Sequence, residues 1–172
     1  MRSNLLLSKY LGQIVYGGSD GIITTFAVVA GFAGAQNESI QMYPMAVVLL
    51  FGFANLFADA TSMGIGNFLS VRSESSLIKK NGGYNKAFFT SIATFLAFIV
   101  FGLIPLAPYI FIQNFNTTFK LSVFFTFLAL LIIGLFRWKV TKEGILRSVG
   151  EVVLLGGASA TVAYFVGTFF RI

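Results

Sequence analysis

Five long apolar stretches, separated by short polar breaks, constrain the fold of this 172-residue chain more than any other feature. A helix needs about 20 predominantly apolar residues to cross the hydrocarbon core of a bilayer. The breaks are too short to hold a separate domain, so the sequence predicts an all-α integral membrane protein whose residues 1–172 form a single membrane domain. We expect the five transmembrane helices at residues 14–35, 43–69, 87–111, 121–136 and 150–169.

The composition supports a membrane protein and limits its chemistry. Hydrophobic residues make up 56% of the chain and charged residues 10%, whereas about a quarter of the residues are charged in a typical soluble domain. The chain contains no histidine and no cysteine, which removes the commonest metal ligand, the usual general base and the thiolate nucleophile. We therefore expect no enzyme activity and no bound cofactor, and any metal must be held by oxygen ligands, water or methionine sulfur.

The basic residues predict the orientation of the chain in the membrane. If the N-terminus is cytoplasmic, ten of the twelve Lys and Arg residues fall on the cytoplasmic side, as the positive-inside rule requires. Only Lys120 and Arg171 then lie outside, so we expect a cytoplasmic N-terminus and an outside C-terminus. The net charge of +6 needs no nucleic-acid partner, because no basic stripe alternates with exposed aromatic residues. The short connections favour a prokaryotic inner membrane, with the lipid bilayer as the surrounding medium.

Two aspartates, Asp20 and Asp59, lie inside predicted spans, where an ionisable side chain is costly and by default marks a binding or transport site. Along the second span, Asn55, Asp59 and Met63 recur every four residues and therefore share one helix face. Amide, carboxylate and water oxygens suit a divalent cation, and the thioether shifts the preference toward a transition metal. The alternative is that Asp59 only hydrogen-bonds a neighbouring helix and that Met63 fills the core.

Asp20 and a third acidic residue, Glu151, allow two interpretations each. Asp20 follows Gly17, Gly18 and Ser19 and precedes Gly21; these glycines allow close backbone approach or a local break that exposes carbonyl oxygens. Alternatively, Asp20 caps a span that begins only at Gly21. Glu151 opens the fifth predicted span on the cytoplasmic side. It either caps the helix N-terminus, where negative charge is favourable, or lies at a cation entrance.

Small residues recur at four-residue spacing in three of the predicted spans. Such ladders let helices approach closely in lipid, where packing rather than the hydrophobic effect drives association. We expect tight helix contacts, within one chain or between two chains, at Ala27, Gly31 and Ala35, at Ala54 and Ala58, and at Gly156 and Ala160.

Four motifs in the sequence resemble those of a known family. Residues 19–35, which begin Ser-Asp-Gly and end Ala-Gly-Phe-Ala-Gly-Ala, resemble the first helix of the vacuolar iron transporter family, which includes short nodulin-like members. Residues 58–70 contain a Ser-Met-Gly-x-Gly core similar to that of the family's second helix. Residues 102–109 and 156–167 resemble its third and fifth helices. The similarity covers nearly the whole chain, with the motifs in the family's order.

The resemblance implies a five-helix protomer, a homodimer with an ion path along the subunit interface, and proton-coupled export of Fe²⁺ or Mn²⁺ from the cytoplasm. The family's first-helix aspartate falls on Asp20 and its second-helix methionine on Met63, and both line the path in that family. Two copies of Asp20, Asn55, Asp59 and Met63 around a two-fold axis would present four carboxylates to one cation.

This sequence departs from the family at two places. The family's typical glutamate eight residues before the methionine is here Asn55, although Asp59 lies one turn later on the same face. The iron-storing members also carry a long Glu- and Met-rich insertion between their second and third helices, whereas residues 70–86 hold one Glu and no Met. We therefore expect no metal-loading cytoplasmic domain, and which metal is carried stays open.

Two other classes of membrane protein remain as alternatives. A small multidrug-type proton-coupled exporter also places a lone carboxylate in its first helix, but such exporters usually have four spans and lack the Ser-Met-Gly-x-Gly pattern. A non-transporting membrane adaptor would need no acidic residue inside the membrane, so it would tolerate the substitution Asp59→Asn.

Overall fold

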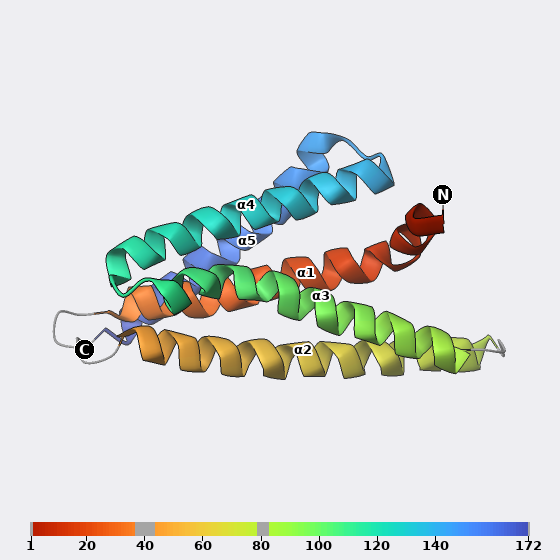
Figure 1. The fold of residues 1–172 in the computed structure, drawn as a ribbon, viewed down its shortest axis with the longest axis horizontal. Coiled ribbons are helices and arrows are strands. Elements are labelled where there is room, and N and C mark those ends of the chain that lie inside the picture. Colours follow the sequence, from red (N-terminus) through yellow and green to blue (C-terminus); the bar gives the residue numbers. More distant parts are fainter. Residues whose placement is uncertain (1, 37–43, 79–82, 172) are drawn as a thin grey trace.

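The computed structural model describes residues 2–36, 44–78 and 83–171, and these residues form a bundle of five long α-helices (Figure 1). Each of the five is long and apolar enough to cross a membrane, which confirms the predicted number of spans. The helices are α1 (Arg2–Ala35), α2 (Pro44–Leu77), α3 (Gly83–Phe111), α4 (Phe115–Thr141) and α5 (Ile145–Phe169).

Most helix ends lie beyond the predicted spans. The second helix continues to Leu77 instead of ending at Leu69, and the fourth runs from Phe115 to Thr141 instead of from Leu121 to Phe136. The fifth begins at Ile145, five residues before the predicted start at Gly150. The predictions counted apolar residues, whereas polar residues continue a helix wherever no strong breaker interrupts its backbone hydrogen bonds.

The helix α1 lies at the centre of the bundle and packs against all four other helices, most extensively against α3 and α5. The pair α2 and α3 runs side by side on one side of α1, and α4 and α5 pack together on the other (Figure 1). The start of α1 lies at the same end of the bundle as the α4–α5 turn, and the end of α5 lies at the opposite end (Figure 1). The bundle therefore divides into an α2–α3 side and an α4–α5 side, which meet at α1 and at a direct contact between α3 and α4.

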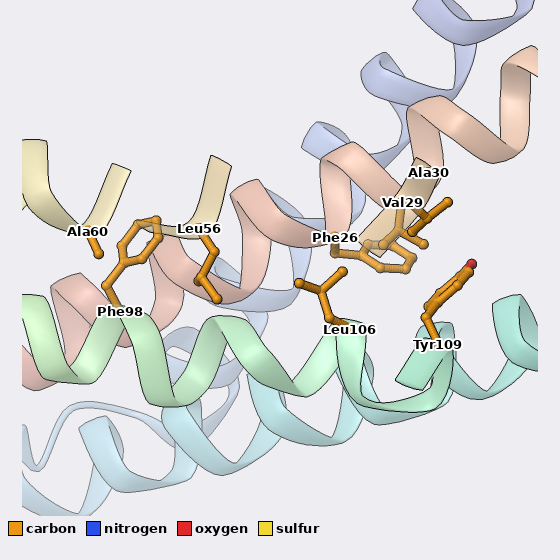
Figure 2. Packing of buried hydrophobic residues seen from close by; sticks show 9 residues of the cluster. Phe26, Val29, Ala30, Leu56, Ala60, Phe98, Leu106 and Tyr109 are labelled. Carbon is orange, nitrogen blue, oxygen red and sulfur yellow. The ribbon is translucent and has the colours of Figure 1, made fainter. Parts of the chain in front are cut away.

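Two hydrophobic clusters follow this division, and α1 contributes to both. The larger joins α1, α2 and α3, and Figure 2 shows Phe26 and Val29 of α1 facing Leu106 and Tyr109 of α3. The smaller packs Ile22 of α1 against buried residues of α4 and α5. Because one helix supplies both clusters, the position of α1 depends on packing from two sides.

Close contact between α1 and α3 depends on two glycines one turn apart. A Cβ atom on Gly17 would lie 2.5 Å from the carbonyl oxygen of Thr94, and one on Gly21 would overlap the carbonyl oxygen of Phe98. The helix is unbroken through this segment, so the glycines serve close backbone approach and the predicted alternative of a local break is wrong. Asp20, which lies between them, is inside the helix, so the helix-cap alternative is wrong as well.

The predicted small-residue ladders behave differently from one another. Gly31 of α1 meets α5, where a Cβ on Gly167 would overlap the carbonyl oxygen of Gly31. This contact confirms tight packing within the chain. Ala54 and Ala58 of α2 are exposed instead, so no helix of the described protomer covers that ladder.

Candidate functional site

The column of polar residues on α2 is present as its four-residue spacing predicts. Asn55, Asp59 and Met63 are all partly buried. The Asn55 Nδ2 donates a hydrogen bond of 2.8 Å to Oδ2 of Asp59, the next member of the column. This bond lies within α2, so it is not the contact with a neighbouring helix that the alternative interpretation required. It links the Asp59 carboxylate to the next polar residue of the column, one turn earlier in α2.

The helix α1 places the second carboxylate close to the first. Asp20 lies in mid-helix and is partly buried, and the charges of Asp20 and Asp59 are near enough to repel each other. The Thr24 hydroxyl donates a 2.9 Å hydrogen bond to the backbone carbonyl of Asp20, so this bond does not involve the Asp20 carboxylate. Two like charges in a region of low dielectric constant attract a cation strongly. The pair therefore has the charge arrangement of a cation site.

Met63 lies where the core meets a polar cavity. It packs against the larger hydrophobic cluster, as the core-filling interpretation predicts, and it also lines a cavity of about 520 Å³ between α1 and α2. Both interpretations of Met63 therefore describe part of its surroundings. The other residues that line the cavity are Gly12, Gln13, Tyr16, Ser62, Gly66, Asn67 and Ser70.

The sequence pattern does not predict this cavity. Gln13, Tyr16 and Ser70 are ordinary polar residues in a helix, and only their meeting across two helices gives them a shared environment. Asn67 is the exception, because it continues the column of Asn55, Asp59 and Met63 by one further step of four residues. Extending the periodicity beyond the methionine would have found it.

Glu151 belongs to a different part of the molecule. Its carboxylate accepts from Arg137 of α4 at 2.8 Å and from Arg147 of α5 at 3.0 Å. Arg137 also pairs with Glu143 in the α4–α5 turn at 3.2 Å. Since α5 begins at Ile145, Glu151 lies beyond its first turn, and the interpretation of Glu151 as a helix cap is wrong.

One protomer supplies too few charged ligands for a closed metal site. Among residues 2–36, 44–78 and 83–171, no three His, Cys, Asp or Glu side chains gather closely enough to hold an ion. The described chain instead supplies two interacting carboxylates, Asp20 and Asp59, and the amide of Asn55. The thioether of Met63 lies on the same face of α2, in a cavity that these three residues do not line. Such a set can bind a cation that keeps some of its water, or it can be completed by ligands from a second copy.

Comparison with known proteins identifies the family. A model of the VIT family matches the chain over residues 11–87 and 79–168. A Toxoplasma gondii protein named vacuolar iron transporter is 26% identical over 96% of this chain and 76% of its own length. Vacuolar iron transporter homolog 4 of Arabidopsis thaliana is 27% identical, with 91% and 82% covered. Vacuolar iron transporter homolog 5 of Oryza sativa is 28% identical, with 91% and 78% covered.

The lengths of these alignments distinguish two kinds of relative. The alignment to the Toxoplasma protein extends over 234 positions, more than the 172 residues of this chain, so that relative carries extra residues inside the matched region. The alignment to the Arabidopsis protein extends over 168. This chain is therefore of the short type, as the connection at residues 70–86 predicts. The five helices argue against a four-span multidrug exporter. Because the family model covers almost the whole chain and the relatives are named as transporters or their homologs, the chain belongs to the VIT family.

Proposed function

We propose that this protein transports a divalent transition metal, Fe²⁺ or Mn²⁺, and exports it from the cytoplasm in exchange for protons. The observation that carries the proposal is that two acidic residues, Asp20 of α1 and Asp59 of α2, lie within membrane-spanning helices and are near enough for their charges to interact. The names of the relatives, which identify vacuolar iron transporters and their homologs, support the choice of metal.

The chemistry of the site suits a borderline cation. Carboxylate and amide oxygens of Asp20, Asp59 and Asn55 provide hard ligands, and the sulfur of Met63 adds a softer one that Ca²⁺ and Mg²⁺ do not favour. A carboxylate must be deprotonated before it binds a metal, so metal binding releases protons. Return of protons from the other side would then release the metal, which makes the transporter an antiporter.

A homodimer would complete the site. The face of α2 that no other helix of the described protomer covers includes Phe51, Ala54, Ala58, Ile65 and Leu69. The two alanines form a ladder of small residues that permits close approach of a second helix. Pairing of two protomers along this face would bring both copies of Asp59 near the two-fold axis and raise the number of carboxylates around one ion to four.

The orientation that the basic residues favour assigns the cytoplasmic end of the bundle. With a cytoplasmic N-terminus, the end of the bundle that holds the start of α1 and the α4–α5 turn faces the cytoplasm (Figure 1). Glu151 lies near that end and is our candidate for a cation entrance, although it pairs with two arginines in the structure. We place the protein in a prokaryotic inner membrane as a single membrane domain, because its connections are short.

Metal flux into proteoliposomes tests the proposal directly. Purified protein is assayed with Fe²⁺, Mn²⁺, Co²⁺, Zn²⁺ and Ca²⁺, with and without a pH gradient, beside the double variant Asp20→Asn, Asp59→Asn. The matched control is Glu74→Gln, which neutralises an exposed acid on the same helix α2. We expect flux of Fe²⁺ or Mn²⁺ that a pH gradient drives and that the double variant loses. Equal flux in the wild type and the double variant, or none in either, would contradict the proposal.

A further inference from the structure

We propose that the side-chain carbonyl of Asn67 is a further metal ligand, which binds the partly hydrated cation in the cavity next to Met63. The inference rests on the proposed transport function and extends the site by one turn of α2. Nothing in the family match or in the names of the relatives assigns a role to this residue. It is carried by the hydrogen bonds of Asn67 and by the polar lining of the cavity.

The hydrogen bonds of Asn67 fix which way its amide points. Its nitrogen Nδ2 donates to the backbone carbonyl of Thr90 at 3.2 Å and to the hydroxyl oxygen of Thr94 at 2.5 Å, both on α3. A carbonyl oxygen only accepts, so the group that faces it must be the NH₂. The Thr94 hydroxyl gives its own proton to the same carbonyl at 3.0 Å, so its oxygen is an acceptor too.

The other end of the amide is therefore available for a cation. With Nδ2 committed to α3, the atom of Asn67 that remains for the cavity is the carbonyl oxygen Oδ1, a hard ligand of the kind that divalent cations bind. Thr90 and Thr94 are buried, so the two hydrogen bonds that hold the amide are shielded from competing water. The side chain is thus preorganised to present an oxygen toward the cavity.

The surroundings of Asn67 fit an ion that still carries water. The cavity of about 520 Å³ has room for several waters, since a water molecule occupies about 30 Å³ in the liquid. Hydroxyls of Ser62 and Ser70 and the amide of Gln13 share the cavity with Asn67 and Met63. These groups can hydrogen-bond the hydration shell while the Asn67 oxygen replaces one of its waters.

The order along α2 gives the ligand a step in transport. Asn67 lies one turn from Met63 and two turns from Asp59 on the same face of the helix. An ion that arrives from the end of the bundle where α2 ends and α3 begins meets a neutral oxygen first and the carboxylate afterwards (Figure 1). Partial dehydration at Asn67 therefore precedes the stronger, charge-driven binding at Asp59.

A structural role, in which Asn67 only joins α2 to α3, is separated from ligation by a matched pair of variants. Asn67→Ala removes the oxygen and both hydrogen bonds. Thr94→Val keeps the Asn67 oxygen and removes the shorter of its two hydrogen bonds, together with the bond from the Thr94 hydroxyl to the Thr90 carbonyl. The bond from Asn67 to the Thr90 carbonyl still orients the amide. Both variants are compared with the wild type for thermal unfolding and for metal flux as a function of metal concentration.

We expect Asn67→Ala to raise the metal concentration that gives half-maximal flux about tenfold, as loss of a metal-site group commonly does. Thr94→Val should leave this concentration within about twofold while lowering the unfolding temperature. An equal rise in both variants, or no rise in Asn67→Ala, would overturn the inference. If Asn67→Ala fails this test while the wild type carries metal and the Asp20, Asp59 double variant does not, only the inference about Asn67 is overturned. Absence of metal flux in the wild type would overturn the proposed function itself.

A labelling experiment covers the case in which Asn67→Ala does not fold. The chain has no cysteine, so Asn67→Cys introduces a single thiol, and Ser76→Cys places the control thiol at an exposed polar position near the end of α2. A small charged thiol reagent should modify the cysteine at position 67, and Mn²⁺ should slow this reaction, whereas the control should show no Mn²⁺ effect. Labelling at position 67 that Mn²⁺ leaves unchanged would overturn the inference.

Discussion

Two regions of the molecule differ in whether the charges of their acidic side chains are balanced by basic residues. At the α4–α5 end, Glu143 and Glu151 each pair with an arginine at 3.2 Å or less. Asp20 of α1 and Asp59 of α2 are near enough for their like charges to interact, and in the described part of the chain neither forms an ion pair with Lys or Arg. The first arrangement is complete as it stands, whereas the second needs a cation or a proton from outside the protein.

This difference explains why charge within a span is not by itself evidence of a site. Glu151 lies in an apolar helix, as Asp59 does, yet its neighbours already balance its charge. Asp59 has an amide from Asn55 as its hydrogen-bond partner, and an amide does not neutralise a carboxylate. The local partners of an acidic residue therefore decide whether it stabilises the fold or is available to bind a cation.

The largest expected effect is that of neutralising the α1–α2 pair. We expect Asp59→Asn to lower metal flux about 100-fold or more, since the variant keeps the shape of the side chain and loses its charge. Glu143→Gln, which removes an acid that is paired with an arginine, is the control and should retain flux. Proteoliposome flux measures both variants, and similar losses in the two would remove the distinction between the regions.

Packing around the pair provides the next prediction. Gly21→Ala should destabilise the protein by about 1–3 kcal/mol, because the added methyl overlaps the carbonyl oxygen of Phe98. Gly157→Ala is the matched control on α5, where a Cβ meets nothing within 4 Å, so it should be neutral or slightly stabilising. Thermal unfolding in detergent measures the difference; a stable Gly21→Ala protein would show that α1 and α3 need no such close contact.

A smaller effect is expected at the candidate entrance. Glu151→Gln should raise the half-saturating metal concentration about twofold at low ionic strength, and this rise should disappear in high salt because an exposed charge is screened. Flux measured at two salt concentrations checks the prediction. If the half-saturating metal concentration does not change at low ionic strength, Glu151 has no role at the entrance and only pairs with Arg137 and Arg147.

The smallest effect is expected from the ion pairs themselves. Arg137→Gln should lower the melting temperature by no more than about 2 °C, since partly exposed salt bridges contribute little to stability. Its metal flux should match that of the wild type. A large loss of flux would instead connect the α4–α5 end to the transport site and contradict the separation of the two regions.

Some of the candidate site was predictable from local sequence and some was not. The spacing of Asn55, Asp59 and Met63 placed them on one face, because helical periodicity depends only on the chain itself. The helix ends were less accurate: hydropathy ended the second helix at Leu69, and the backbone continued to Leu77. The pairing of Glu151 with Arg137 was missed, since it joins residues of two helices.

The sequence by itself determined that this chain is a bundle of five membrane helices with two acidic residues inside it, because hydropathy and helical spacing are local properties. Tertiary structure decided which groups meet. The approach of α1 to α3 through Gly17 and Gly21 and the packing of α2 on α3 bring Asp20 to Asp59 and turn the amide of Asn67. These contacts depend on how three helices fit together at once, and no single stretch of sequence contains that information.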